Sequence, residues 1–140
     1  MIGTANIPLG TSARKSVEVT GDMTVANFHS SMPEVYGTPM MIYLMEEAAR
    51  EAIQGYLPDG LVSVGATINV KHLAATPVGF KVTATAKVVS VSNNLITFAV
   101  EAHDGIEKIG EGIQVRAAVE VKQFDRRVRL KARRAGEGSL

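Results

Sequence analysis

Residues 38–55 read TPMMIYLMEEAAREAIQG, and this stretch predicts one long amphipathic helix. Thr38 can accept a hydrogen bond from a free backbone amide as the N-cap, and Pro39 loses no helical hydrogen bond at the first helical position. We therefore expect the main helix over residues 40–55, with Gly55 able to end it. At about 100° per residue, the apolar side chains share one broad face. They are Met41, Ile42, Leu44, Met45, Ala48, Ala49, Ala52 and Ile53.

Glu46 lies on the border between this apolar face and the polar face. On the helical wheel it is about 20° from the direction of Ile53. Two interpretations are open. Glu46 can form an ordinary surface ion pair with Arg50 at i, i+4. Alternatively, partial burial removes water from its carboxylate, which raises its proton affinity and makes it a better base.

The chain after residue 61 predicts four strands, because it is rich in Val, Ile and Thr with partial alternation. We expect them at residues 62–73, 80–91, 95–103 and 109–121. Short turns between them imply antiparallel neighbours, and the turns at 92–94 and 104–105 have hairpin residues. Before the helix, we expect a loose lead-in over 1–13, a short strand at 17–19 and a loop or irregular lid over 21–37. One helix against such a sheet is an α+β layer.

Composition indicates a single domain over residues 1–140 and limits its chemistry. With 46% hydrophobic residues and 140 in total, the chain can form one core. A net charge of +1 argues against a nucleic-acid binder, although a basic tail over 131–140 belongs to a C-terminal stretch that holds seven of the 15 Lys and Arg. No long apolar run or signal peptide occurs, so we expect a cytoplasmic protein that does not enter the membrane. The absence of cysteine excludes a thiol nucleophile.

Several motifs together resemble the hotdog-fold thioesterases, and among them the fluoroacetyl-CoA thioesterase group. The resemblance covers roughly residues 14 to 130 in matching order. It rests on Thr38 with Met41 and Leu44-Met45-Glu46, on His72 with Ala74-Ala75-Thr76-Pro77 and Gly79, and on Ala102-His103-Asp104-Gly105 followed by Ile109-Gly110 and Arg116-Ala117. It implies a hotdog fold, in which a curved antiparallel sheet wraps one long central helix. It also implies a homodimer whose sheets pair edge to edge, with active sites at the interface.

The same resemblance implies a catalytic set of Thr38, Glu46 and His72, with Gly65 near the thioester carbonyl. We expect further contacts with the substrate from Met32, Tyr36, Met41 and Arg116. No metal is implied, and the only cofactor is the coenzyme A portion of the substrate itself.

Thioester hydrolysis needs a nucleophile or an activated water, a proton source for the sulfur, and donors for the oxyanion. Glu46 can be the base, His72 can move a proton near neutral pH, and Thr38 lies where a helix dipole favours negative charge. Each group also has a simpler interpretation, because Thr38 can be only an N-cap and His72 can merely end a strand. Water activation by Glu46, an anhydride on Glu46 and an acylated Thr38 all remain open.

We therefore expect hydrolysis of a short-chain acyl-CoA whose acyl group is open. Met32 and His29 replace the lid aromatics of the best-known relative, so discrimination of one fluorine does not follow. Two alternatives are a non-catalytic acyl-CoA-binding module and a hotdog hydratase or dehydratase. The second usually pairs Asp and His on one segment, and no such pair stands beside His72. The basic tail can be a solvated end or can meet coenzyme A phosphates.

Overall fold

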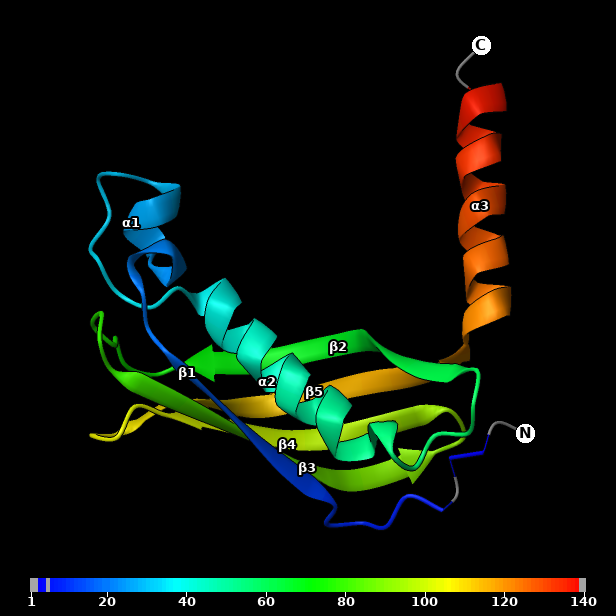
Figure 1. Ribbon diagram of the computed structural model, residues 1–140, viewed down its shortest axis with the longest axis horizontal. Helices are drawn as coiled ribbons and strands as arrows, with labels where there is room; N and C mark the ends of the chain where they lie inside the picture. The colour runs from blue at the N-terminus through cyan, green and yellow to red at the C-terminus, as the bar shows by residue number, and fades with distance from the viewer. Residues whose placement is uncertain (1–2, 5, 139–140) are drawn as a thin grey trace.

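The computed structural model describes residues 3, 4 and 6–138, and Figure 1 shows one helix lying across one face of a sheet. The strands are β1 (Ser12–Glu18), β2 (Leu61–His72), β3 (Lys81–Ser92), β4 (Leu95–His103) and β5 (Lys108–Glu120). The helices are α1 (Val25–Phe28), α2 (Thr38–Gln54) and α3 (Val121–Gly138), with a short 3-10 turn η1 (Gly21–Met23) before α1. The four strands predicted after the helix are confirmed to within one residue at each end.

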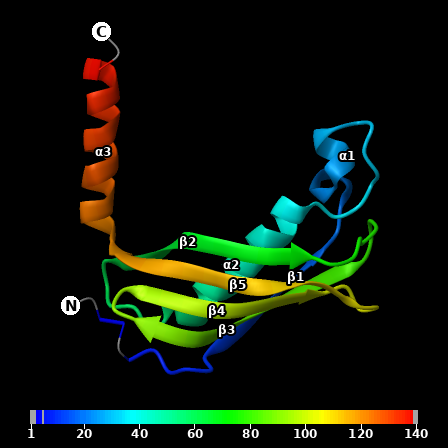
Figure 2. The same ribbon diagram turned by 180° about the vertical axis from the view of Figure 1, so that it is seen from behind.

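The five strands form one antiparallel sheet in the order β1-β3-β4-β5-β2. The sheet is twisted and curls around α2, as the two opposite views show (Figures 1 and 2). Two of its hairpins turn where the sequence predicts, with positive φ at Asn93 (56°) and Gly105 (91°). Because β1 and β2 are the edges, β2 has one side that pairs with β5 and one side that pairs with no described strand.

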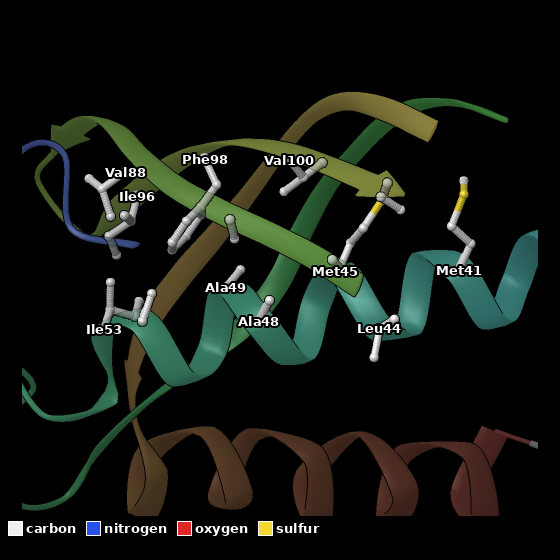
Figure 3. Packing of buried hydrophobic residues seen from close by; sticks show 14 of the residues in the cluster. Met41, Leu44, Met45, Ala48, Ala49, Ile53, Val88, Ile96, Phe98 and Val100 are labelled. Atoms are coloured by element: carbon white, nitrogen blue, oxygen red, sulfur yellow. The ribbon is translucent and has the colours of Figure 1, made fainter. Parts of the chain in front are cut away.

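The core lies between α2 and the concave face of the sheet (Figure 3). Met45 and Ala49 of the helix are fully buried, as are Phe98 and Ile96 of β4. Small alanines on this helix face let the backbone approach the sheet closely, and that favours close packing of the larger side chains around them. Seven of the eight side chains predicted for the apolar face are buried, and Ile42 is only half-buried.

The structure corrects three boundaries. The main helix begins at Thr38, not after it, because the backbone carbonyl of Gly37 accepts the first helical hydrogen bonds and Gly37 is the N-cap. Strand β1 begins at Ser12, so the lead-in predicted over 1–13 is too long by two residues. The tail predicted over 131–140 is helical as far as Gly138, and residues 139 and 140 lie outside the described part.

None of the helices in the described part of the chain is long and apolar enough to cross a membrane.

Candidate active site

Thr38 and His72 form the first of two side-chain groups around α2. Thr38 starts this helix, His72 ends β2, and the Thr38 Oγ1 lies 2.7 Å from the His72 Nδ1. The hydroxyl therefore bonds to the imidazole and to no helix amide, so the interpretation of Thr38 as an N-cap is wrong. The other ring nitrogen of His72, Nε2, is buried and has no hydrogen-bond partner among the described residues. A buried polar atom without a partner is unusual in a folded protein and marks His72 as a candidate functional residue.

A pocket of about 450 Å³ opens beside this pair. Its lining includes Thr38, His72, Met32 and Tyr36. Met32 is 48% exposed, whereas Tyr36 is buried and its hydroxyl donates a 3.2 Å hydrogen bond to the carbonyl of Met40. Burial raises the pKa of Tyr36 to about 12, so this phenol stays protonated at neutral pH. The structure thus places a rigid aromatic wall and a flexible methionine around one cavity.

Met41, which we expected to contact substrate, takes a different position. It is fully buried and lines neither this pocket nor the one beside Glu46. A Cβ added to Gly110 would come within 2.5 Å of the Met41 sulfur, so the two residues fit closely together. In this structure Met41 is a core residue that fixes α2 on β5.

Glu46, Gly65 and Arg116 form the second group. The Glu46 Oε2 lies 3.5 Å from Nη1 of Arg116, and the Glu46 side chain is one-third exposed. The alternative ion pair with Arg50 is wrong, because the Arg50 guanidinium binds Glu47 instead at 2.8 and 3.0 Å. Glu46 therefore takes no part in the ion pair between Arg50 and Glu47, and its carboxylate points toward Arg116 in the sheet.

Arg116 is held in place before it meets Glu46. Its Nε donates to the Ser63 hydroxyl and its Nη2 donates to the Ser63 carbonyl, both at 2.8 Å. Burial lowers the pKa of Arg116, and the charge of Glu46 opposes that shift. With only 6% of its surface exposed, Arg116 is built to position the carboxylate. Ser63 was missed from the sequence, where one serine in a β strand carries no specific signal.

Gly65 has no side chain, and this leaves the space that the Glu46 carboxylate occupies. It pairs with Arg116 at a bulge in β2, where the register shifts before Thr67. A Cβ added to Gly65 would lie 2.6 Å from the Glu46 Oε2, which is closer than real Cβ contacts. A side chain here would displace the carboxylate.

We expect Gly65→Ala to lower kcat by about 100-fold, because a displacement of about 1 Å at a reacting group costs that much. The backbone of Gly65 needs no left-handed conformation, so the fold should survive the added methyl group. Steady-state kinetics with a thermal melt measures both effects. Gly136→Ala, in the exposed part of α3, is the control for an added methyl group, and equal kinetics in the two variants would contradict the geometry.

A second missed pair supports the loop after His72. The Thr76 hydroxyl donates to the Asp104 Oδ2 at 2.9 Å, and the amides of Ile106 and Glu107 donate to its Oδ1 at 3.0 Å. Burial opposes ionisation, but these hydrogen bonds outweigh it and lower the pKa of Asp104. The carboxylate therefore ties the β4–β5 turn to Thr76, the residue after the pocket-lining Ala75.

His72 should remain neutral to a lower pH than a solvated histidine. Burial lowers its pKa below the ordinary 6.5, with a backbone contact at Ala74 acting in the opposite direction. As the pH falls, half of the neutral imidazole should be lost only at a pH below 6.5. NMR titration of the imidazole signals, assigned with His29→Gln and His103→Gln variants, measures this shift. A His72 midpoint at or above 6.5 would contradict it.

The two groups are separate within one chain. Thr38 and Glu46 are eight residues apart on α2, which is about 12 Å along a helix. Gly65 and His72 are seven residues apart on β2, which is about 23 Å along a strand. Each group borders its own pocket. Among the described residues, no three His, Asp or Glu side chains are placed to hold a metal ion.

A curled antiparallel sheet around one long helix, with a hydroxyl, an imidazole and a carboxylate on the helix and its neighbouring strand, defines the class of hotdog-fold thioesterases. Solved structures agree with this class. A thioesterase superfamily member from Thermus thermophilus superposes with a TM-score of 0.89 at 27% identity, covering 96% of this chain and 99% of that one. A fluoroacetyl-CoA thioesterase structure gives 0.85 at 36% identity, covering 90% and 98%.

The sequence places the chain more narrowly. The model of the fluoroacetyl-CoA-specific thioesterase family matches residues 19–122, and the chain belongs to this family. The fluoroacetyl-CoA thioesterase of Streptantibioticus cattleyicolor is 42% identical over 102 residues, which is 73% of each chain. The expected hotdog fold and thioesterase activity are thereby confirmed. The α3 helix lies almost entirely beyond the matched residues.

Proposed function

We propose that this thioesterase hydrolyses short-chain acyl-CoA at a site built from two subunits. Thr38 and His72 come from one subunit, and Glu46, Gly65 and Arg116 come from the other. The observation that carries the proposal is the division of the candidate residues into two compact groups on opposite stretches of α2 and β2. A structure of a family enzyme with a substitution was solved with fluoroacetate and CoA, which supports CoA as the carrier.

The free edge of β2 offers a way to join the groups. Residues 65–69 on this strand are exposed, and a strand edge with unpaired backbone groups readily pairs with another copy. A two-fold axis makes such pairing antiparallel and self-complementary. If the axis passes through the facing Asn69 residues, the extra residue at the Gly65/Thr67 bulge sets Gly65 opposite His72 of the partner subunit, and each dimer then has two complete sites.

In this site the thioester carbonyl lies between Thr38 and Gly65. The backbone amide and the hydroxyl of Thr38 would stabilise the oxyanion, since a helix N-terminus favours negative charge; Pro39 has no N–H, and the amides of Met40 and Met41 donate to Gly37. Glu46 either attacks the carbonyl to form an anhydride or takes a proton from the attacking water. In both routes the C–S bond breaks and a proton from water reaches the CoA sulfur. Neutral His72 can accept that proton and pass it on.

An isotope experiment detects the anhydride route when water opens the anhydride at its Glu46 carbonyl. A single turnover in oxygen-18 water labels only the released acid when water attacks the thioester directly. When the anhydride forms and water attacks its Glu46 carbonyl, the label enters the Glu46 side chain, where peptide mass spectrometry detects it. The proposed chemistry uses no cofactor beyond the coenzyme A that is part of the substrate.

Release of free thiol from a panel of acetyl-, fluoroacetyl-, propionyl- and aromatic acyl-CoA tests the proposal. We expect turnover with short acyl groups and much slower turnover with aromatic ones. The half-exposed Met32 at the pocket mouth makes a less sharply shaped lid, so we expect weak discrimination between acetyl and fluoroacetyl. Binding of CoA thioesters without thiol release, or hydration of an enoyl-CoA, would contradict the proposed reaction.

A further inference from the structure

The α3 helix stands apart from the rest of the molecule. It continues from β5, and its first amide, on Val121, donates a 2.9 Å hydrogen bond to the carbonyl of Gly60. Every residue from 121 to 137 is exposed. In both views α3 extends past the β2 edge, and α1 extends past the same edge at the other end (Figures 1 and 2). Most helices in proteins are stabilised by packing against other elements, and α3 has little such packing. Its exposed side chains are therefore candidates for a binding role.

Charge is concentrated on this helix. Of its ionisable side chains, seven are Lys or Arg and two are Asp or Glu, whereas the remainder of the chain has eight basic and twelve acidic residues. The helix therefore has a formal charge of +5, and the remainder of the chain has a formal charge of −4. The total of +1 does not reveal this division. Such an arrangement attracts anions to α3 in preference to the rest of the surface.

Three arginines on α3 surround a hollow. Arg126, Arg129 and Arg133 line it together with Ala132, whose small side chain leaves space between the guanidinium groups. Arg129 forms a 2.9 Å ion pair with Asp125. Arg126 and Arg133 have no ion pair within the described part of the chain. Free, closely spaced guanidinium groups are the usual means of binding phosphate, because each can donate two parallel hydrogen bonds.

The proposed dimer brings this hollow next to a substrate pocket. The register that sets Gly65 opposite His72 of the partner subunit directs the start of β2, at Leu61, toward the segment that follows the partner's His72. Leu61 pairs with Glu120, the last residue before α3. In this chain the residues of that segment, namely Leu73, Ala74 and Ala75, line the substrate pocket. By symmetry, each α3 stands beside the pocket of the other subunit.

We propose that Arg126, Arg129 and Arg133 bind the phosphate groups of the coenzyme A whose thioester occupies the adjacent pocket. This inference rests on the proposed function, because it needs the two-subunit site. Coenzyme A has a pyrophosphate and a ribose phosphate at the end remote from the thioester. The arginine hollow would hold that end while the acyl group reaches Thr38 and His72. Binding energy would then come from a part of the substrate that does not react.

The test uses the full chain with Arg126, Arg129 and Arg133 all changed to Gln. A matched control changes Arg127, Lys131 and Arg134 to Gln, which removes the same charge from a face about 130° away around the helix. Calorimetry measures binding of CoA and of adenosine 3′,5′-bisphosphate, and kinetics compares acetyl-CoA with acetyl-pantetheine, which lacks the phosphates. The first variant should weaken CoA binding and raise KM for acetyl-CoA by about tenfold, with kcat and acetyl-pantetheine kinetics unchanged.

The control should change each value by less than about twofold, because screening weakens exposed charges outside direct contact. Equal losses in both variants, or no loss in either, would overturn the inference. So would a loss of binding to vesicles of phosphatidylglycerol and phosphatidylcholine with CoA binding intact, since that result assigns α3 to a membrane surface.

CoA binding can be measured without turnover, so the two proposals can fail separately. An enzyme that binds CoA through the arginine hollow but releases no thiol would refute the proposed function and leave the phosphate site standing.

Discussion

Glu46→Gln is expected to lower kcat on acyl-CoA by about 100- to 10,000-fold, the range for loss of a positioned acid-base group. The amide keeps the size of the carboxylate but can neither attack the carbonyl nor take a proton from water. Its position next to Gly65 and Arg116 should persist, because Ser63 holds Arg116 independently. Stopped-flow or steady-state thiol release measures the loss, and a thermal melt shows that the fold remains.

Glu51→Gln is the matched control, since Glu51 lies on the same helix but is exposed and pairs with Lys15 on β1. It should retain the wild-type rate. A wild-type rate in Glu46→Gln would remove Glu46 from the mechanism. A loss of the same size in both variants would assign the effect to helix charge in general.

His72→Ala should lower kcat by about 100- to 1,000-fold, because no other described side chain near Thr38 is placed to carry the proton. The substitution also leaves the Thr38 hydroxyl without its 2.7 Å partner. KM for acetyl-CoA should change less than kcat, since the substitution alters one wall of the acyl pocket but leaves the proposed contacts of the CoA phosphates in place. Thiol-release kinetics across pH 5 to 8 measures both constants.

His103→Ala provides the comparison for this variant, because His103 ends β4 on the exposed surface and approaches Glu101 at 3.8 Å. Activity should be kept there. If His72→Ala retains its activity while Thr38→Ala loses it, the hydroxyl acts without the imidazole, and the pair would have to be reassigned.

The sequence predicts the framework of this protein well because local signals determine it. Thr38-Pro39 and Gly55 mark the ends of α2, and the turn residues Asn93 and Gly105 set two hairpins. The joint pattern of Thr38, Glu46 and His72 was also visible as a resemblance. These features depend on neighbours in the chain, so they can be derived before any contact is known.

Long-range contacts could not be derived in the same way. The Glu46–Arg116 approach depends on the β2 bulge at Gly65 and on the Ser63 anchor, which belong to different elements. Helical periodicity places Met41 on the apolar face of α2 but does not predict that it packs against Gly110 of β5. The high charge of the C-terminal segment predicts a solvated tail, whereas the structure shows the exposed helix α3 there.

The division of the site between subunits is tested most directly by a mixed dimer. Glu46→Gln and His72→Ala chains with different affinity tags are co-expressed, and the heterodimer is isolated by two successive purifications. One of its two sites then contains both substitutions, and the other contains neither. We predict about half of the wild-type activity per dimer, against almost none in either parent homodimer. Activity in the heterodimer no higher than in the parents would show that each site is contained within one subunit.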